Sequence, residues 1–355
     1  MPVEGEKEDM SKHLTSVVAG KREKRWVNSG ELILRYGTIA MVILLIVIFG
    51  ALEPRFLGID NWMNILRSAS ILIVIAVGMT IGLSAGGFDL SVGTTTSLAS
   101  MVAAVLLLWC NAPVWISIAV SLLVGMLVGF VNGALVVYLG VNTILATLGM
   151  SFVLNGVCHT ISKGLPVHNF MTNPWTSERA TGFISDSFRW IAIGDIGSIP
   201  VLVLIALGIS LFGHILLNQS RWGRYFYIIG SNPDAGYMSG INVDRNKVLA
   251  YVLCSALAAL GGILLTARIG SGQLDVGESY LLLGLLACFV GHTVLAAGKP
   301  FVPGTVLGAL FATILVNGLT IIGVHPYSAN IFRGLALLLA VVIQSYQTIR
   351  ARAAR

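Results

Sequence analysis

The chain is constrained above all by a series of long apolar segments, which leave too few charged residues to cover a water-soluble domain. Only 11% of its residues are charged, whereas a soluble domain carries about 25%. About 20 mostly apolar residues suffice to span a bilayer, so we expect an all-α, polytopic membrane protein with about ten spans. The expected spans are 34–52, 66–84, 94–110, 114–137, 142–161, 199–218, 248–268, 280–297, 303–322 and 328–346.

The distribution of lysine and arginine predicts the orientation of these spans. An even number of spans places both termini on one side, and the cytoplasmic side carries the excess of basic residues. With the termini inside, the cytoplasmic side holds fifteen lysines and arginines and the outer side seven. We therefore expect a flexible cytoplasmic arm at 1–30, one transmembrane domain at 31–347 and a basic cytoplasmic tail at 348–355. An outer loop would cover 162–198 and a cytoplasmic loop 219–247.

The cytoplasmic loop at 219–247 carries a signal for the start of a helix. The side chain of Asn232 can accept hydrogen bonds from the free amides of a first helical turn. Pro233 suits the first helical position because its missing N–H would be unpaired there in any case. The sequence thus predicts a short helix, Pro233–Gly240, on a basic loop. Such a helix is well placed to bind a soluble partner.

A second polar stretch, at 86–97, interrupts the apolar segments. Gly86 and Gly87 predict a break between two helices, and Asp89 follows them. A carboxylate at membrane depth is costly unless it meets water, a partner or backbone amides. Asp89 therefore either faces a polar pathway for a hydroxylated solute or caps a helix and orders the core. The candidates for lining a pathway are Phe88, Asp89, Ser91, Thr94, Asn132 and Asn317.

Two short sequences suggest an internal repeat. Val131-Asn132-Gly133 ends the fourth expected span and Val316-Asn317-Gly318 ends the ninth. These spans run in opposite directions, which is typical of the inverted repeats of transporters, here with five spans in each half. A GxxxG pattern at Gly125–Gly129 predicts close helix packing, either within one subunit or between subunits.

Two catalytic motifs, the phosphate-binding loop of ATPases and HExxH, are missing from the sequence. Gly298-Lys299 is followed by Pro300, so the loop that cradles phosphates in ATPases is not formed there. HExxH does not occur either, so we expect a non-catalytic protein without a metal or cofactor of its own and without a nucleic-acid partner. Active transport would need energy from another subunit. The alternative is a secondary transporter driven by an ion gradient, although the chain has few acidic residues within its spans.

Three motifs together resemble one family. Gly87-Phe88-Asp89-Leu90-Ser91-Val92-Gly93 resembles the GxDLSVG motif of the permeases of bacterial ABC sugar importers of the ribose, xylose and galactose type. The segment from Gly223-Arg224 to Val243 resembles the cytoplasmic segment of that family. Asn317-Gly318-Leu319 through Arg333-Gly334 resembles its C-terminal region.

The resemblance implies a multi-pass permease of the bacterial inner membrane with a fold similar to that of the vitamin B12 importer. Two permease subunits, identical or different, would line one path, and a periplasmic solute-binding protein would deliver the solute. Cytosolic ATPases holding ATP and Mg²⁺ would bind the loop. The residues that match the family's coupling segment are Arg224, Asn232, Pro233, Asp234, Ala235, Ser239, Gly240 and Ile241.

The chain departs from the family pattern in two places. Gly236, Tyr237 and Met238 stand where the family has a second alanine followed by a basic or polar residue. Residues 291–300 read GHTVLAAGKP where the family is rich in glycine. The first departure leaves open which ATPase surface the loop fits. The second indicates either a different solute or a heterodimer with a second, more typical permease. The sequence leaves the solute open among sugars, polyols, nucleosides and sugar-like signal molecules.

Overall fold

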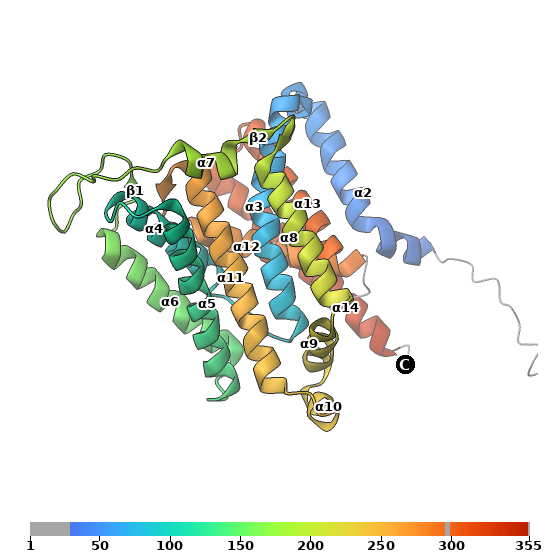
Figure 1. The fold of residues 1–355 in the computed structure, drawn as a ribbon. Helices are drawn as coiled ribbons and strands as arrows, with labels where there is room; N and C mark the ends of the chain where they lie inside the picture. The colour runs from blue at the N-terminus through green and yellow to red at the C-terminus, as the bar shows by residue number, and fades with distance from the viewer. Residues whose placement is uncertain (1–28, 295–298, 354–355) are drawn as a thin grey trace, which may run out of the picture.

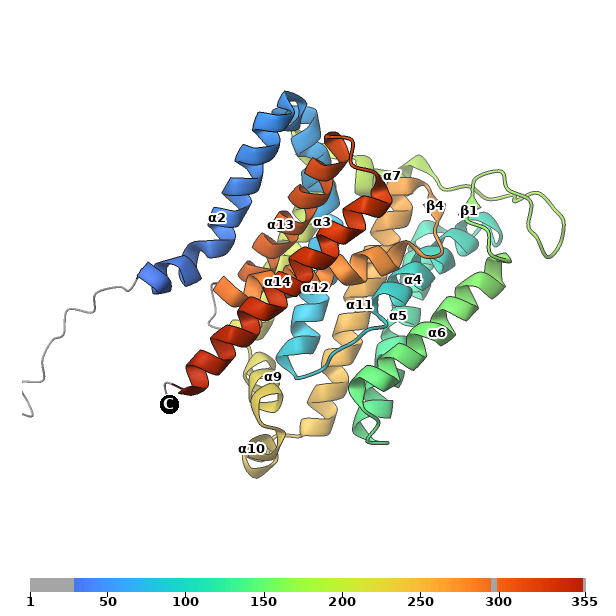
Figure 2. The same cartoon turned by 180° about the vertical axis from the view of Figure 1, so that it is seen from behind.

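The computed structural model describes residues 29–294 and 299–353. The expected arm at 1–30 lies outside the described residues except for its last two positions. Ten long helices overlap the ten expected spans, and Figures 1 and 2 show them side by side in one bundle. They are α2 (Ser29–Leu52), α3 (Ile59–Ser84), α4 (Val92–Leu108), α5 (Val114–Val137), α6 (Thr143–Ser162), α8 (Val201–Asn218), α11 (Val243–Ile269), α12 (Val276–Val294), α13 (Val302–Ile321) and α14 (Pro326–Ala353).

Six of these helices are long and apolar enough to cross a membrane by themselves: α3, α5, α6, α8, α11 and α13. The other four contain shorter apolar segments, which are Gly37–Leu52, Val92–Leu108, Val276–His292 and Tyr327–Val342. The all-α polytopic fold is therefore confirmed. α3 begins seven residues before its expected span, because the helix continues through a polar first turn that contains Asp60.

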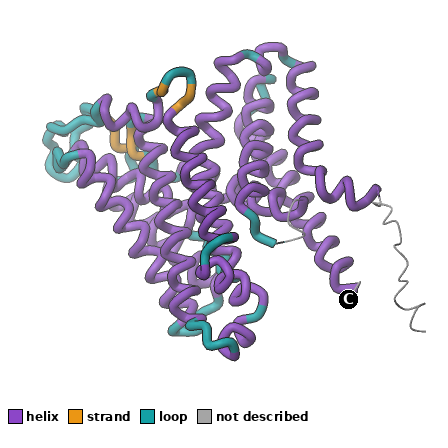
Figure 3. The backbone as a smooth tube through the Cα atoms, turned by 45° about the vertical axis from the view of Figure 1, so that its right-hand side comes forward, coloured by secondary structure: helices purple, strands orange, loops and turns teal. Residues whose placement is uncertain are grey.

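The remaining elements are short and lie mostly near the two ends of the bundle, as Figure 3 shows. They are the 3₁₀ helix Pro54–Leu57 and helices α7 (Asp186–Ile193), α9 (Arg221–Ser231) and α10 (Pro233–Met238). Strand β1 (Val167–His168) pairs antiparallel with β4 (Ser271–Gly272), and β2 (Asp195–Ile196) pairs with β3 (Ile199–Pro200). Figure 1 shows α10 and α7 at opposite ends of the bundle, hereafter the α10 end and the α7 end.

The structure corrects the expected organisation of 219–247. This segment was expected to hold one short helix, but it forms two, and α9 turns back from the end of α8 before α10 begins. The expected helix Pro233–Gly240 ends earlier, at Met238, because Gly240 adopts a left-handed φ of 73°. The signal for α9 was available in the sequence, since Ser220 can cap it and its buried residues Phe226 and Ile229 follow helical spacing.

Helices α3 and α11 form the centre of the bundle, and both are far more buried than α5, α6 or α8. Small residues allow their close contacts. A Cβ built on Gly125 of α5 would lie 2.4 Å from the Cβ of Ala259 in α11, and one on Gly129 would lie 2.5 Å from the carbonyl oxygen of Tyr251. The GxxxG pattern of α5 thus packs within one subunit.

Two irregular segments, 86–91 and 270–275, occupy corresponding places in the two halves of the chain. Each follows a central helix, starts with a left-handed glycine (Gly86, φ 73°; Gly270, φ 78°) and leads into a helix that begins Val-Gly. The glycines of those two Val-Gly pairs, Gly93 and Gly277, contact each other. Segment 86–91 contacts α9, whereas β4 in the second segment pairs with β1, toward the α7 end (Figure 2). Equivalent residues of two halves can contact each other only near the two-fold axis that relates those halves. The contact between Gly93 and Gly277 therefore supports the inverted repeat.

Candidate functional site

The candidate site is centred on Asp89, which lies in the irregular segment between α3 and α4. Its side chain is only 7% exposed. Oδ1 of Asp89 accepts hydrogen bonds from the backbone amide of Ser91 at 2.8 Å and from the Ser91 hydroxyl at 2.7 Å. Oδ2 accepts one from the hydroxyl of Ser255 in α11 at 3.2 Å. The carboxylate therefore fixes the first turn of α4 to a central helix.

Asn132 of α5 completes this group. Its Nδ2 donates to the Ser91 hydroxyl at 2.8 Å and lies 3.5 Å from Oδ1 of Asp89. Asn132 is fully buried, and its Oδ1 has no partner among the residues that the structure describes. Asp89, Ser91, Asn132 and Ser255, hereafter the Asp89 network, thus join α5 and α11 to the irregular segment that leads into α4.

Helix α6 holds the same segment through a row of hydroxyl groups spaced four residues apart. The hydroxyl of Thr147 accepts a hydrogen bond from the Leu90 amide at 3.1 Å, and Ser151 lies 3.3 Å from the hydroxyl of Thr94. One turn earlier, the hydroxyl of Thr143 bonds to that of Tyr251 in α11. Residues four apart lie on one face of a helix, so α6 presents a polar stripe to the irregular segment.

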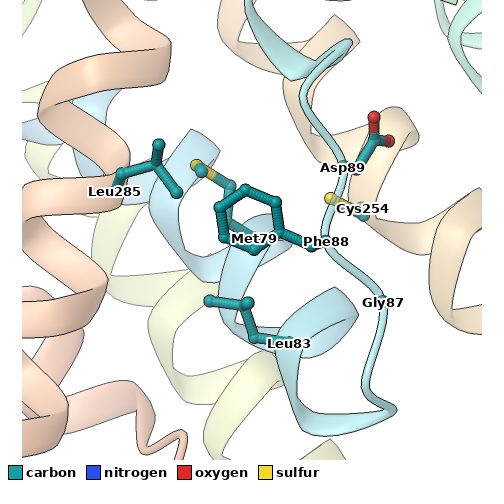
Figure 4. Close-up of a pocket in the computed structure, with 7 residues that line it drawn as sticks. All are labelled: Met79, Leu83, Gly87, Phe88, Asp89, Cys254 and Leu285. Carbon is teal, nitrogen blue, oxygen red and sulfur yellow. The ribbon is translucent and has the colours of Figure 1, made fainter. Parts of the chain in front are cut away.

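Phe88 and Asp89 point in opposite directions, as Figure 4 shows. The Phe88 ring turns toward Met79 and Leu285, while the carboxylate of Asp89 points away from them. A cavity of about 10 Å³ lies at this place, lined by Met79, Leu83, Gly87, Phe88, Asp89, Cys254 and Leu285. This volume suits about one water molecule. In this conformation the cavity is too small to hold a sugar.

A second candidate site is the exposed helix α10. Oδ1 of Asn232 accepts from the amides of Asp234 at 3.0 Å and Ala235 at 3.2 Å, so the predicted cap is confirmed. Pro233 occupies the first helical position. The coupling candidates Arg224, Asn232, Pro233, Asp234, Ala235, Ser239 and Gly240 are exposed, and Ile241 is half-buried.

The unusual residues 236–238 have a structural basis. Gly236 is buried, and a Cβ built on it would lie 3.1 Å from Cγ2 of Val243, so glycine lets α10 pack closely on α11. The hydroxyl of Tyr237 donates to Oδ1 of Asp244 at 2.5 Å, and this bond raises the pKa of Tyr237 above its usual value. Met238 is 90% exposed. Tyr237 therefore fastens α10 to α11, and Met238 offers an apolar contact.

Comparison with known sequences identifies the family. Residues 61–341 match the family described as branched-chain amino acid transport system / permease component. The chain is 36% identical over 336 residues to the ribose import permease protein of Escherichia coli strain K12, covering 93% of this chain and 98% of that protein. The chain belongs to this permease family.

Other curated relatives agree. The galactose/methyl galactoside import permease protein of Haemophilus influenzae is 32% identical over 328 residues, covering 88% of this chain and 95% of the relative. The ribose import permease protein of Bacillus subtilis is 33% identical over 321 residues, covering 90% and 96%. No solved structure matches the chain significantly. The permease is thus a non-catalytic, multi-pass membrane subunit of a transport system, which favours the ABC importer interpretation over a gradient-driven transporter.

In this permease, α9 connects α10 with both halves of the chain. A Cβ built on Gly230 of α9 would lie 2.3 Å from the carbonyl oxygen of Ser84 and 3.0 Å from the amide nitrogen of Gly86. The hydroxyl of Tyr227 donates to the carbonyl oxygen of Pro300 at 2.6 Å, in the connection before α13. α9 therefore rests directly on the irregular segment that carries Asp89.

The permease does not bring all the pathway candidates together. Phe88, Asp89, Ser91, Thr94 and Asn132 lie close together, but Asn317 does not join them. Its side chain exchanges two hydrogen bonds with that of Asn61 in α3, at 2.9 and 3.0 Å. Sequence reasoning missed Ser255, Thr147 and Ser151. The four-residue spacing of α6 could have indicated the last two, but Ser255 carries no such signal.

Proposed function

We propose that the chain forms the translocation path of an ATP-driven importer for a monosaccharide or a similar small hydroxylated solute. This proposal is supported by the relatives, whose names specify import of ribose and of galactose or methyl galactoside. Separate cytosolic ATPase subunits would hold ATP and Mg²⁺ and supply the energy. A solute-binding protein outside and a second permease subunit, identical or different, would complete the complex.

The α10 end of the bundle faces the cytoplasm in this proposal. Basic residues concentrate in the segment at 219–247 and at both termini, and such residues favour the cytoplasmic side. The location is the bacterial inner membrane. The exposed helix α10, with Tyr237 and Met238, would then be the contact surface for an ATPase.

The observation that carries the proposal is the contact between Gly230 and the segment Ser84–Gly86. A movement of α10 displaces α9, and α9 has no free space against this segment because backbone atoms already touch. Closely packed interfaces transmit displacement instead of absorbing it. The segment that bears Phe88 and Asp89 would therefore follow the ATPases, and the path would open alternately to each side.

The candidate residues take different roles in this mechanism. Asp89, Ser91, Thr94 and Asn132 position the irregular segment and keep its polar groups paired while the path is closed. Phe88 faces the small cavity and would be the side chain that leaves or enters the path. Asn317, paired with Asn61, would act away from the Asp89 network by joining α13 to α3.

Reconstitution of the complete importer in proteoliposomes tests this function. ATP-driven uptake of D-ribose and D-galactose would be measured with the permease, its ATPase and its binding protein. Vesicles that hold the permease alone should take up neither sugar. N232A/D234A should impair ATPase binding, because it removes the cap and a charge of α10, while S231A serves as the neighbouring control. Gradient-driven uptake by the permease alone would contradict the proposal, and so would a complex unchanged by N232A/D234A.

A further inference from the structure

A polar cluster outside the Asp89 network lies between α6 and the start of α12. Nδ2 of Asn155 donates to Oδ1 of Asp275 at 3.1 Å, and Nε2 of His159 lies 3.1 Å from the same oxygen. The side chains of His159 and Asp275 are 40% and 54% exposed. Asn155, His159 and Asp275 thus form a compact cluster, hereafter the Asp275 cluster, that is open on one side.

Two residues of the Asp275 cluster, Asn155 and His159, lie within α6, a helix long and apolar enough to cross a membrane. α6 has 20 residues, which corresponds to a length of about 30 Å, the thickness of the hydrocarbon core. Asn155 precedes the last residue of α6, Ser162, by two turns, so it lies roughly 10 Å inside that end. A carboxylate held there against lipid would be strongly unfavourable. Polar, irregular backbone at this depth is tolerated where protein covers it or where it lines a water-filled cavity.

The internal repeat shows how unusual this exposure is. Counting back from the touching glycines Gly277 and Gly93, Asp275 occupies the position of Ser91. Ser91 is fully buried in the Asp89 network, whereas Asp275 is more than half exposed. At this equivalent position, the residue toward the α10 end is buried and the residue toward the α7 end is exposed.

The polar stripe of α6 connects the two segments. Thr143, Thr147 and Ser151 contact segment 86–91 or its neighbours, and Asn155 and His159 continue the same four-residue spacing to Asp275. These polar groups therefore form one continuous row along α6, which turns around the helix by about 40° with each step, from the Asp89 network to the Asp275 cluster. This is the arrangement expected along a path for a polar solute.

We propose that Asn155, His159 and Asp275 form a contact site for a hydroxyl-bearing solute in the half of the path toward the α7 end. This inference rests on the proposed function. A carboxylate accepts hydrogen bonds from hydroxyl groups, and an amide both donates and accepts. The Asp275 carboxylate already accepts from Asn155 and keeps exposed oxygen surface for a sugar hydroxyl, while Asn155 and His159 orient it.

The first test asks whether the Asp275 cluster meets water. N155C and V153C would be made in a C110S background, because Cys110 is exposed while Cys158, Cys254 and Cys288 are buried. Val153 is exposed and lies roughly 160° around α6 from Asn155 at nearly the same depth. In the complete importer in proteoliposomes, a membrane-impermeant cationic methanethiosulfonate reagent should label N155C at least about tenfold faster than V153C. Equal or slower labelling of N155C would show a lipid or protein contact and overturn the proposal.

The second test asks whether the Asp275 cluster contacts the solute during transport. D275N should reduce ATP-driven uptake of D-ribose or D-galactose by about tenfold, the effect of losing one hydrogen bond to a charged group, while assembly and ATP hydrolysis persist. S279A, an exposed change one turn along α12, is the matched control. Normal uptake by D275N overturns this proposal alone. A wild-type complex that imports neither sugar counts against the proposed function. In that case the labelling test still determines whether the Asp275 cluster is in contact with water.

Discussion

Gly277 contacts the backbone of Gly93 so closely that a Cβ built on Gly277 would lie 1.8 Å from the carbonyl oxygen of Gly93. The contact is mutual, since a Cβ on Gly93 would lie 2.7 Å from the carbonyl oxygen of Gly277. The two glycines come from equivalent positions of the two halves. Their contact joins α4 to α12 and places both irregular segments.

G277A should destabilise the permease strongly. The new methyl group would overlap a backbone oxygen that cannot rotate away, and overpacking in a closed core costs about 1–3 kcal/mol or more. The melting temperature in detergent measures this effect. It is determined from the fraction of protein that remains monodisperse as the temperature rises. G208A is the control, because a Cβ at Gly208 in α8 meets no atom within 4 Å. A G277A protein as stable as G208A would contradict the assigned contact.

D89A should lower both stability and transport. Without the carboxylate, the amide of Ser91 and the hydroxyls of Ser91 and Ser255 lose their acceptor, and each unsatisfied buried group costs about 1–3 kcal/mol. D89N should retain part of the stability, because its side-chain oxygen still accepts from the Ser91 amide. Thermal stability and sugar uptake of the two variants would be compared. If D89A and D89N behaved alike and kept wild-type stability, Asp89 would not order the segment.

G230A should separate ATP hydrolysis from transport. The added methyl group would meet the carbonyl oxygen of Ser84 and shift α9 relative to the irregular segment, while α10 keeps its exposed surface. We expect normal binding of the ATPase and uptake reduced by about tenfold. ATP hydrolysis and sugar uptake would be measured in the same proteoliposomes, which gives the ratio of sugar imported to ATP hydrolysed. G208A should leave this ratio unchanged, and an unchanged ratio in G230A would argue against α9 as the connection.

The bond between Tyr237 and Asp244 should make α10 insensitive to pH near neutrality. A raised pKa means that the folded state favours the protonated phenol, so the bond is fully present below the usual pKa of about 10 and weakens only as the pH rises through the higher folded value. ATPase affinity should thus be constant between about pH 6 and pH 9. Y237F, which lacks the donor, should bind the ATPase about threefold more weakly across that range. A wild-type affinity that changes within this range, or a Y237F affinity equal to wild type, would contradict this role.

Local patterns accounted for the helices of this protein better than for the contacts between them. The spans followed from the length of the apolar segments, and the cap of α10 followed from Asn232, whose partners are two and three residues away. α9 was missed because the many polar residues of 219–247 suggested an irregular loop. Phe226 and Ile229 follow helical spacing, and the segment forms helix α9 because both side chains are buried against the bundle.

The same difference between local patterns and contacts between helices applies to the candidate site. Asp89 was identified from its place beside Gly86 and Gly87, but its partner Ser255 lies in a distant helix. Asn317 was grouped with Asn132 because the two share a short motif, yet it pairs with Asn61 instead. A shared motif shows equivalent positions in a repeat. It does not place two side chains at one site, because repeat-related residues coincide only near the axis, as Gly93 and Gly277 do.

The sequence alone determined that the chain is a bundle of apolar helices with a break at Gly86 and a capped helix at Pro233, because apolar length, glycine and capping act between near neighbours. Tertiary structure decided which polar groups are buried and which stay exposed. Ser91 and Asp275 hold equivalent positions, yet Ser91 is buried against Asn132 of α5, whereas Asp275 stays exposed beside Asn155 and His159 of α6.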